Sequence, residues 1–143
     1  MQIQVNNFSM AYSDQGRGTP IVLLHGYPLN HHIFNPQLDE LSQQARIITP
    51  DLRGHGGSQA VPGPYSMDLL AQDVAALLDQ LRISEPVILG GLSMGGYVTF
   101  AFYRLYPERV KGLILTATRA AADTHQTREA RHHAAETARR QGV

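Results

Sequence analysis

Short runs of aliphatic residues alternate with polar stretches along the first 116 residues of the chain. Runs of about four to eight apolar residues, bounded by glycine, proline or asparagine, are typical of buried strands. We expect the first two strands to be joined by a turn at Asn6 and Asn7 and to pair antiparallel at one edge of a sheet. Residues 14–18 are expected to form a loop. The pattern predicts strands at residues 2–5, 8–12, 20–24, 46–50, 86–89 and 110–116.

Helical patterns lie between the later strands. Ser66 can cap a helix, and Asp68 in its first turn complements the helix dipole. A short helix is expected over residues 35–43, and another follows a glycine-rich segment and ends at Tyr106. Alternating strands and helices predict an α/β fold, with a mainly parallel sheet of about six strands and helices on both faces. The helix after Ser66 should bury one face, formed by Leu70, Val74, Leu77, Leu78 and Leu81.

The last part of the chain has a different composition. Between Arg119 and Gln141 there is no Leu, Ile, Val, Met or aromatic residue, and the only apolar residues are seven alanines. Such a segment has a high helix propensity but little apolar surface to bury. We therefore divide the chain into a core at residues 1–118 and an Ala/Arg-rich helical tail at residues 119–143.

The overall composition excludes several functional classes. The 143 residues carry 12 basic and 12 acidic side chains, so no net charge attracts nucleic acid or an anionic membrane. No apolar run approaches the roughly 18–20 residues that span a bilayer, and no signal-peptide pattern is seen. The absence of cysteine excludes disulfides and thiolate metal sites. We expect a soluble, cytoplasmic protein with no cofactor.

The sharpest motif is Gly91-Leu92-Ser93-Met94-Gly95, which follows an aliphatic run and opens a helical pattern. In this setting a G-x-S-x-G segment predicts a nucleophile elbow, a tight strand-to-helix turn that exposes the serine hydroxyl. The glycines leave room for chains that approach closely at such a turn. The alternative interpretation is a glycine-rich turn whose serine only caps the helix.

A second motif, His25-Gly26-Tyr27-Pro28, directly follows the strand at residues 20–24. Ester hydrolysis passes through an oxyanion that needs preorganised N–H donors. The residue after the nucleophile, Met94, offers one backbone N–H, and Tyr27 is the best candidate for another because Pro28 has none. Alone, the motif would indicate a plain loop with a hydrogen-bonded histidine.

Other polar clusters favour structural roles. Asp51 and Arg53 lie in a glycine-rich loop after the strand at residues 46–50 and could pair. His31 and His32 indicate a loop pair rather than a metal site. In the tail, a solvated helix face is favoured over a metal site, and His133 points about 100° away from that face. The face is formed by His125, Glu129, His132 and Glu136.

Together the motifs resemble the N-terminal half of an α/β-hydrolase, over residues 2–123. The branch it is most similar to contains enol-lactonases, carboxylesterases and serine perhydrolases. The resemblance implies that Ser93 is the nucleophile and that the Tyr27 and Met94 N–H groups form the oxyanion hole. A serine at the turn argues against the dehalogenase and epoxide-hydrolase branches, which use a carboxylate. The motifs that carry the resemblance are HGYP, PDLRGHGGS, PYSMDLLAQDVAALLDQL, GLSMGG and YPERVKGLIL.

In this family the acid and the histidine base follow on later strands, and this chain ends before either. The tail would correspond to the first lid helix. Three interpretations stay open: a short serine hydrolase acting on small esters or lactones, a fragment that needs a complementary chain, and an inactive binding module. The strand at residues 110–116 would be an uncovered edge, so we expect a homo-oligomer, a dimer. Candidates for the base and its orienting acid are His25, His55, His125, His132, His133 and Asp123.

Overall fold

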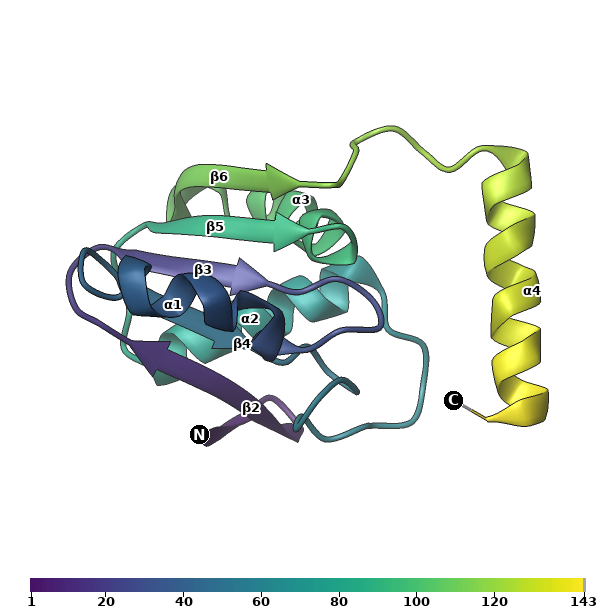
Figure 1. Cartoon of the computed structure of the whole chain (residues 1–143), viewed down its shortest axis with the longest axis horizontal. Helices are drawn as coiled ribbons and strands as arrows, with labels where there is room; N and C mark the ends of the chain where they lie inside the picture. Colours follow the sequence, from purple (N-terminus) through teal and green to yellow (C-terminus); the bar gives the residue numbers. More distant parts are fainter. Residues whose placement is uncertain (143) are drawn as a thin grey trace.

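A computed structural model describes residues 1–142, which contain one six-stranded sheet. The strand order across the sheet is β1-β2-β4-β3-β5-β6 (Figure 1). The first two pairings, β1 with β2 and β2 with β4, are antiparallel, whereas the remaining three are parallel. The predicted mainly parallel α/β sheet with an antiparallel edge is therefore confirmed. The strands are β1 (Gln2–Val5), β2 (Phe8–Gln15), β3 (Pro20–Leu24), β4 (Arg46–Pro50), β5 (Val87–Leu92) and β6 (Val110–Thr116).

Two strands are longer than the sequence pattern predicts. β2 continues through Asp14 to Gln15, where a loop was expected, because its polar end pairs with β4 and Asp14 bonds the Arg46 side chain. β5 continues through both glycines to Leu92. In both places backbone pairing with a neighbouring strand outweighs the weak local strand signal.

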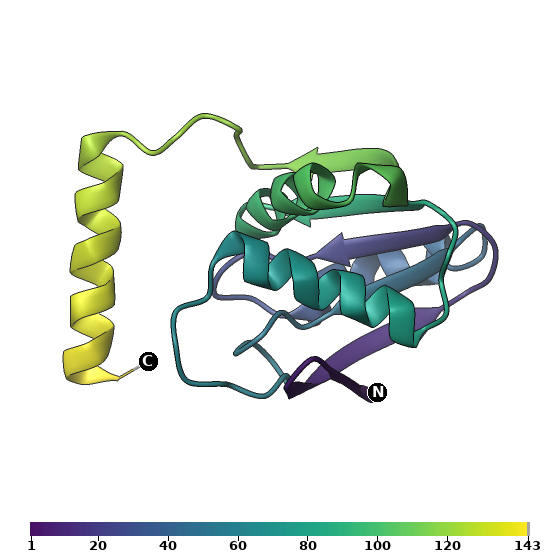
Figure 2. The same ribbon diagram turned by 180° about the vertical axis from the view of Figure 1, so that it is seen from behind.

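Helices cover the two faces of the sheet unequally. α1 (Asn35–Leu41) lies on one face, whereas α2 (Met67–Gln80) and α3 (Met94–Leu105) lie side by side on the other (Figures 1 and 2). Short 3-10 helices at His31–Phe34 and Pro107–Arg109 precede α1 and β6. The main core fills the space between the sheet and α2 and α3, with Phe8, Met10, Leu24, Ile48, Leu70, Leu77, Leu89 and Phe102 fully buried.

The tail forms α4 (His125–Gln141), which begins after the capping residue Thr124 and stands clear of the sheet at the carboxyl ends of its strands (Figure 1). None of its residues is buried. The guanidinium of Arg131 lies 6.0 Å from the centre of the Tyr97 ring on α3. Within residues 1–142, no helix has the length and apolarity needed to cross a membrane.

Candidate active site

Ser93 occupies the turn between β5 and α3 in a strained conformation, with φ 52° and ψ −110°. Non-glycine residues rarely adopt positive φ, and such strain is often found at functional sites. Its backbone is tied to the end of β6, because its N–H donates to the Thr116 carbonyl (2.9 Å) and its carbonyl accepts from Thr118 Oγ1 (3.0 Å). The Ser93 side chain makes no capping hydrogen bond to α3. The hydroxyl is thus not used as an ordinary helix cap.

Close approach of backbone explains the glycines around this turn. A Cβ on Gly91 would collide with the carbonyl of Gly95, and a Cβ on Gly95 would collide with the carbonyl oxygen of Leu24. The start of α3 therefore rests directly on the end of β3. Met94 is the first residue of α3, so its N–H has no acceptor within the helix.

The loop after β3 brings the second motif against the turn. A Cβ built on Gly26 would lie 3.1 Å from the Leu92 carbonyl oxygen and 3.3 Å from Ser93 Cβ, so the loop approaches the turn closely at Gly26. Tyr27 follows Gly26, and its side chain is 65% exposed. Among residues 1–142, neither the Tyr27 N–H nor the Met94 N–H donates a backbone hydrogen bond. Both donors named from the sequence are therefore free and belong to residues next to the Ser93–Gly26 contact.

His25 is fully buried, and both of its ring nitrogens have backbone partners. Its Nε2 accepts from the Leu52 N–H (2.9 Å), so its Nδ1 carries the proton and donates to the Gly26 carbonyl (2.9 Å). Burial lowers the pKa of His25 below its ordinary value of 6.5, which favours this neutral form. With both nitrogens engaged, His25 is a poor candidate for the base.

Asp51 does not pair with Arg53, and the sequence-based suggestion of that pair is wrong. Its carboxylate accepts from the His31 N–H and Nδ1 (both 2.7 Å) and from the Gly57 N–H (2.8 Å). Burial raises the pKa of Asp51, but the hydrogen bonds from His31 and Gly57 outweigh it and hold the pKa below its ordinary value. Asp51 thereby ties the loop after β3 to the loop after β4.

Arg53 pairs instead with Asp73 on α2, through two hydrogen bonds of 2.8 and 2.7 Å. Both side chains are buried, with relative exposures of 3% and 0%. The guanidinium also stacks over the Phe8 ring at 4.2 Å and donates to Asn7. No local signal links residues 20 positions apart, so the sequence could not reveal this pair.

The remaining histidine candidates are His55, which lies beside the loop after β3, and three histidines on α4. His55 lies edge-on to the Tyr27 ring (6.0 Å between centres) and 5.2 Å from the His25 ring. Its Nδ1 donates to the Arg53 carbonyl (3.0 Å), which leaves Nε2 as the free nitrogen. Within the described part of the chain, the Ser93 hydroxyl has no hydrogen bond to a histidine. The tail candidates His125, His132 and His133 all lie exposed on α4.

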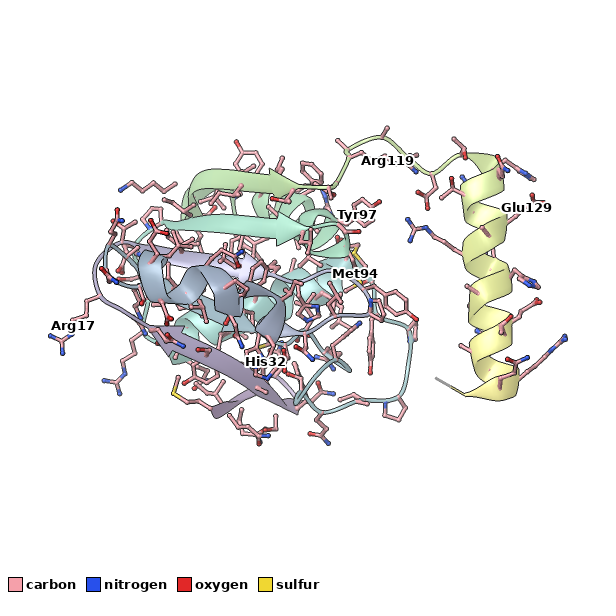
Figure 3. The ribbon with its side chains drawn as sticks, viewed as in Figure 1. Arg17, His32, Met94, Tyr97, Arg119 and Glu129 are labelled. Carbon is pink, nitrogen blue, oxygen red and sulfur yellow. The ribbon has the colours of Figure 1, made fainter. Side chains whose placement is uncertain are left out.

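Asp123 does not orient a histidine. Its carboxylate accepts from Arg119 (2.9 Å) and from Arg131 Nε (2.7 Å), and these two bonds lower its pKa. On α4, His125 approaches Glu129 at 3.4 Å. Between Met1 and Gly142, no three His, Asp or Glu side chains come together as a metal site. Figure 3 shows Met94 and Tyr97 at the start of α3, on the side that faces α4.

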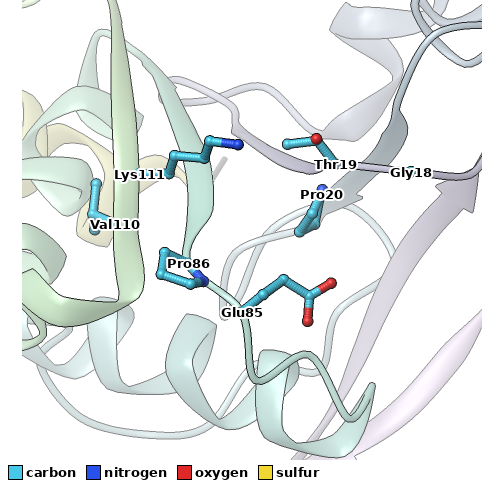
Figure 4. A pocket seen from close by; sticks show the side chains of 7 residues that line it. All are labelled: Gly18, Thr19, Pro20, Glu85, Pro86, Val110 and Lys111. Atoms are coloured by element: carbon cyan, nitrogen blue, oxygen red, sulfur yellow. The ribbon is translucent and has the colours of Figure 1, made fainter.

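A separate hollow lies at the opposite end of the sheet, at the amino ends of β3, β5 and β6 (Figure 4). Its charged side chains are Glu85 and Lys111, which have opposite signs. It is thus far from Ser93, which lies beyond the carboxyl end of β5. Its lining is Gly18, Thr19, Pro20, Glu85, Pro86, Val110 and Lys111.

Comparisons with known proteins identify the family to which the chain belongs. The profile of the family described as "alpha/beta hydrolase fold" matches residues 19–138. The chain is 41% identical over 113 residues to the AB hydrolase superfamily protein YisY of Bacillus subtilis, covering 78% of this chain and 42% of that protein. Epoxide hydrolases are also among the similar proteins.

Two solved structures match almost the whole chain. A thermophilic esterase from Thermogutta terrifontis has a TM-score of 0.93 and 43% identity, covering 99% of this chain and 54% of that one. The enol-lactonase from Burkholderia xenovorans LB400 has a TM-score of 0.89 and 31% identity, covering 99% and 55%. This chain therefore spans about half the length of these proteins. It belongs to the α/β-hydrolase fold family and corresponds to its N-terminal portion.

Proposed function

We propose that the chain carries the nucleophile and the oxyanion hole of a serine hydrolase that cleaves carboxylic esters or lactones through an acyl-enzyme on Ser93. The observation that carries this proposal is the Ser93 hydroxyl, which caps no helix and stands at a strained turn. The N–H groups of Tyr27, in the loop after β3, and of Met94, at the start of α3, make no backbone hydrogen bond and belong to residues that adjoin Gly26 and Ser93.

In the proposed first step, Ser93 Oγ bonds to the carbonyl carbon and gives its proton to a base, while the carbonyl π electrons move onto oxygen. The Tyr27 and Met94 N–H groups donate to that oxyanion. When the carbonyl re-forms, the bond to the alcohol oxygen breaks and the leaving oxygen takes up a proton. Water then attacks the acyl group in the same way, which releases the acid and restores the Ser93 hydroxyl. A lactone gives a hydroxy acid by these steps.

Two further observations support ester or lactone substrates. The similar structures include an esterase and an enol-lactonase. The residue at the turn is a serine, whereas displacement at an epoxide carbon by the same turn would call for a carboxylate nucleophile. An alcohol nucleophile suits attack on a carbonyl carbon.

A second candidate function is a binding module, or a hydrolase half that needs a complementary chain. It is favoured by one observation: among residues 1–142, no histidine is hydrogen-bonded to the Ser93 hydroxyl. A serine hydroxyl without a base is a weak nucleophile at neutral pH. The oxyanion hole and binding alone can still leave about 10³–10⁴-fold acceleration over water.

A fluorophosphonate probe tests the proposal directly. We expect slow labelling of the chain, with the adduct on Ser93 in a peptide digest. Ser93→Ala should not be labelled, while the control Ser13→Ala, which removes a hydroxyl on β2, should be labelled like the wild type. Labelling that persists in Ser93→Ala, or none in the wild type, contradicts the nucleophile assignment and favours the inactive module.

A further inference from the structure

Two arginines in the segment after β6 share one carboxylate. Asp123 accepts from Arg119 Nη2 at 2.9 Å and from Arg131 Nε at 2.7 Å, and Arg131 Nη2 lies 3.4 Å from the Asp123 oxygen that Arg119 binds. Two cations therefore share a single anion, which leaves a net charge of +1. Within residues 1–142, the Nη1 atoms of both arginines make no hydrogen bond. We call Arg119, Asp123 and Arg131 the arginine cluster.

The arginine cluster is held next to the Ser93 turn at both of its ends. Arg119 directly follows Thr118, whose Oγ1 donates to the Ser93 carbonyl (3.0 Å). The Arg131 guanidinium lies 6.0 Å from the centre of the Tyr97 ring, and the Tyr97 N–H donates to the same Ser93 carbonyl (3.4 Å). Figure 3 shows Arg119 and Tyr97 on the side of the core that faces α4. The cluster therefore lies among residues that contact the Ser93 backbone directly or are adjacent to one that does.

The rest of the tail adds positive charge on the same side of the molecule. Residues 119–141 carry five arginines and three acidic residues, a net charge of +2, whereas residues 1–118 have a net charge of −2. All five arginines are exposed. Because α4 stands at the carboxyl ends of the strands, this charge lies on the side where Ser93 is placed (Figure 1). Positive charge around a site raises the local concentration of anionic ligands.

A role in fastening α4 explains only part of this arrangement. One arginine on Asp123, stacked on the Tyr97 ring, would be enough for that purpose and would leave no net charge. The second arginine leaves a positive charge and N–H groups without an acceptor in the described chain. A guanidinium presents its N–H groups as a planar fork that fits the two oxygens of a carboxylate. A net charge of +1 matches a singly charged carboxylate better than a doubly charged phosphate monoester.

We propose that the arginine cluster binds a carboxylate of the substrate, so that the preferred substrates are esters or lactones that also carry a free carboxylate. The carboxylate accepts from the Nη1 groups of Arg119 and Arg131 while the ester carbonyl meets Ser93. The two arginines then determine specificity and take no part in making or breaking bonds. The ester chemistry in this inference rests on the proposed function, whereas binding of the carboxylate does not.

Two aryl esters of equal length test the inference. Mono-4-nitrophenyl adipate ends in a carboxylate, whereas 4-nitrophenyl hexanoate ends in a methyl group at the same position. After subtraction of uncatalysed hydrolysis, acylation of Ser93 at low salt should be about three- to tenfold faster with the adipate ester, as expected for exposed charge-assisted contacts. Arg131→Gln should abolish this preference, because Arg119 alone then neutralises Asp123, and Arg131→Lys should keep part of it. Arg140→Gln, which removes the same charge from the last turn of α4, should keep all of it.

A second measurement needs no turnover. Equilibrium dialysis of both esters against Ser93→Ala should give tighter binding of the adipate ester, and the difference should shrink in about 1 M NaCl, where the Debye length is about 3 Å. The proposal is overturned if the two esters bind equally, if they acylate the wild type at measurable but equal rates, or if Arg131→Gln slows both equally, since Arg131 would then only fasten α4. Tighter binding of the adipate ester to Ser93→Ala without acylation of wild-type Ser93 would instead refute the proposed function and leave the carboxylate site intact.

Discussion

The buried ring of His25 donates from Nδ1 to the carbonyl oxygen of Gly26, at 2.9 Å. That carbonyl also accepts the Leu29 N–H (2.8 Å), so two bonds fix its direction. In a trans peptide the N–H points opposite to the C=O of the same unit. The N–H in the same peptide plane belongs to Tyr27. His25 therefore sets the direction of one proposed oxyanion donor without touching substrate.

Replacing His25 with leucine should free this peptide plane. We expect the rate of fluorophosphonate labelling at Ser93 to fall. The upper limit of this fall is about 10²–10³-fold, the effect typical of losing one oxyanion donor. His32→Leu, at an exposed position in the 3-10 helix, is the matched control and should label normally. A folded His25→Leu protein that labels at the wild-type rate would show that the ring does not position Tyr27.

The same histidine predicts a pH dependence of stability. Burial lowers the pKa of His25 below 6.5, so between these pKa values the unfolded chain binds a proton that the folded chain does not. The free energy of unfolding is therefore complete above the unfolded pKa and falls as the pH drops from about 6.5 toward the folded pKa. Urea unfolding at about pH 7.5 and pH 5.5 should show this loss in the wild type and less of it in His25→Leu. An equal loss of unfolding free energy between the two pH values in both proteins would contradict this prediction.

The buried Arg53–Asp73 pair should contribute strongly to stability. Arg53→Leu leaves the Asp73 carboxylate unpaired at 0% exposure, and removal of one partner of a buried pair typically costs about 3–5 kcal/mol. Urea unfolding measures the change. Arg104→Leu, which breaks an exposed pair with Asp68, should have little effect. Similar losses of unfolding free energy in the two variants would show that burial of the Arg53–Asp73 pair is not the cause of its stabilising effect.

Gly95→Ala should destabilise the turn, because the added Cβ would collide with the Leu24 carbonyl and push α3 from β3. Overpacking of this kind costs about 1–3 kcal/mol. Gly112→Ala is the matched control: its Cβ would meet only Ile88 Cγ1, at 3.9 Å. Thermal unfolding of both variants separates the two effects, and equal midpoints would contradict the close approach at Gly95.

The sequence was sufficient for features that local pattern controls. Each parallel strand is an aliphatic run, and the helix after Ser66 has both its cap and its apolar face, with Ser66 Oγ accepting the Leu69 N–H (3.1 Å). Features set by distant partners could not be predicted. The sequence suggests Arg53, a near neighbour, as a partner for Asp51, whereas its partner is His31, which lies next to it because β3 and β4 are adjacent.

The candidate site also contains features that follow from local sequence and features that depend on distant residues. The turn at Ser93 was predicted from five consecutive residues, since glycine spacing and strand-to-helix order are local. The role of His25 could not be predicted, because it depends on the Leu52 N–H, which lies 27 positions away.

The most direct test of the central claim is to trap the acyl-enzyme. The chain is mixed with p-nitrophenyl acetate, quenched in acid and digested for mass spectrometry. The account predicts an acetyl group on Ser93 that is absent from Ser93→Ala. An acetyl group elsewhere at equal yield in Ser93→Ala, or no adduct in the wild type, would contradict it.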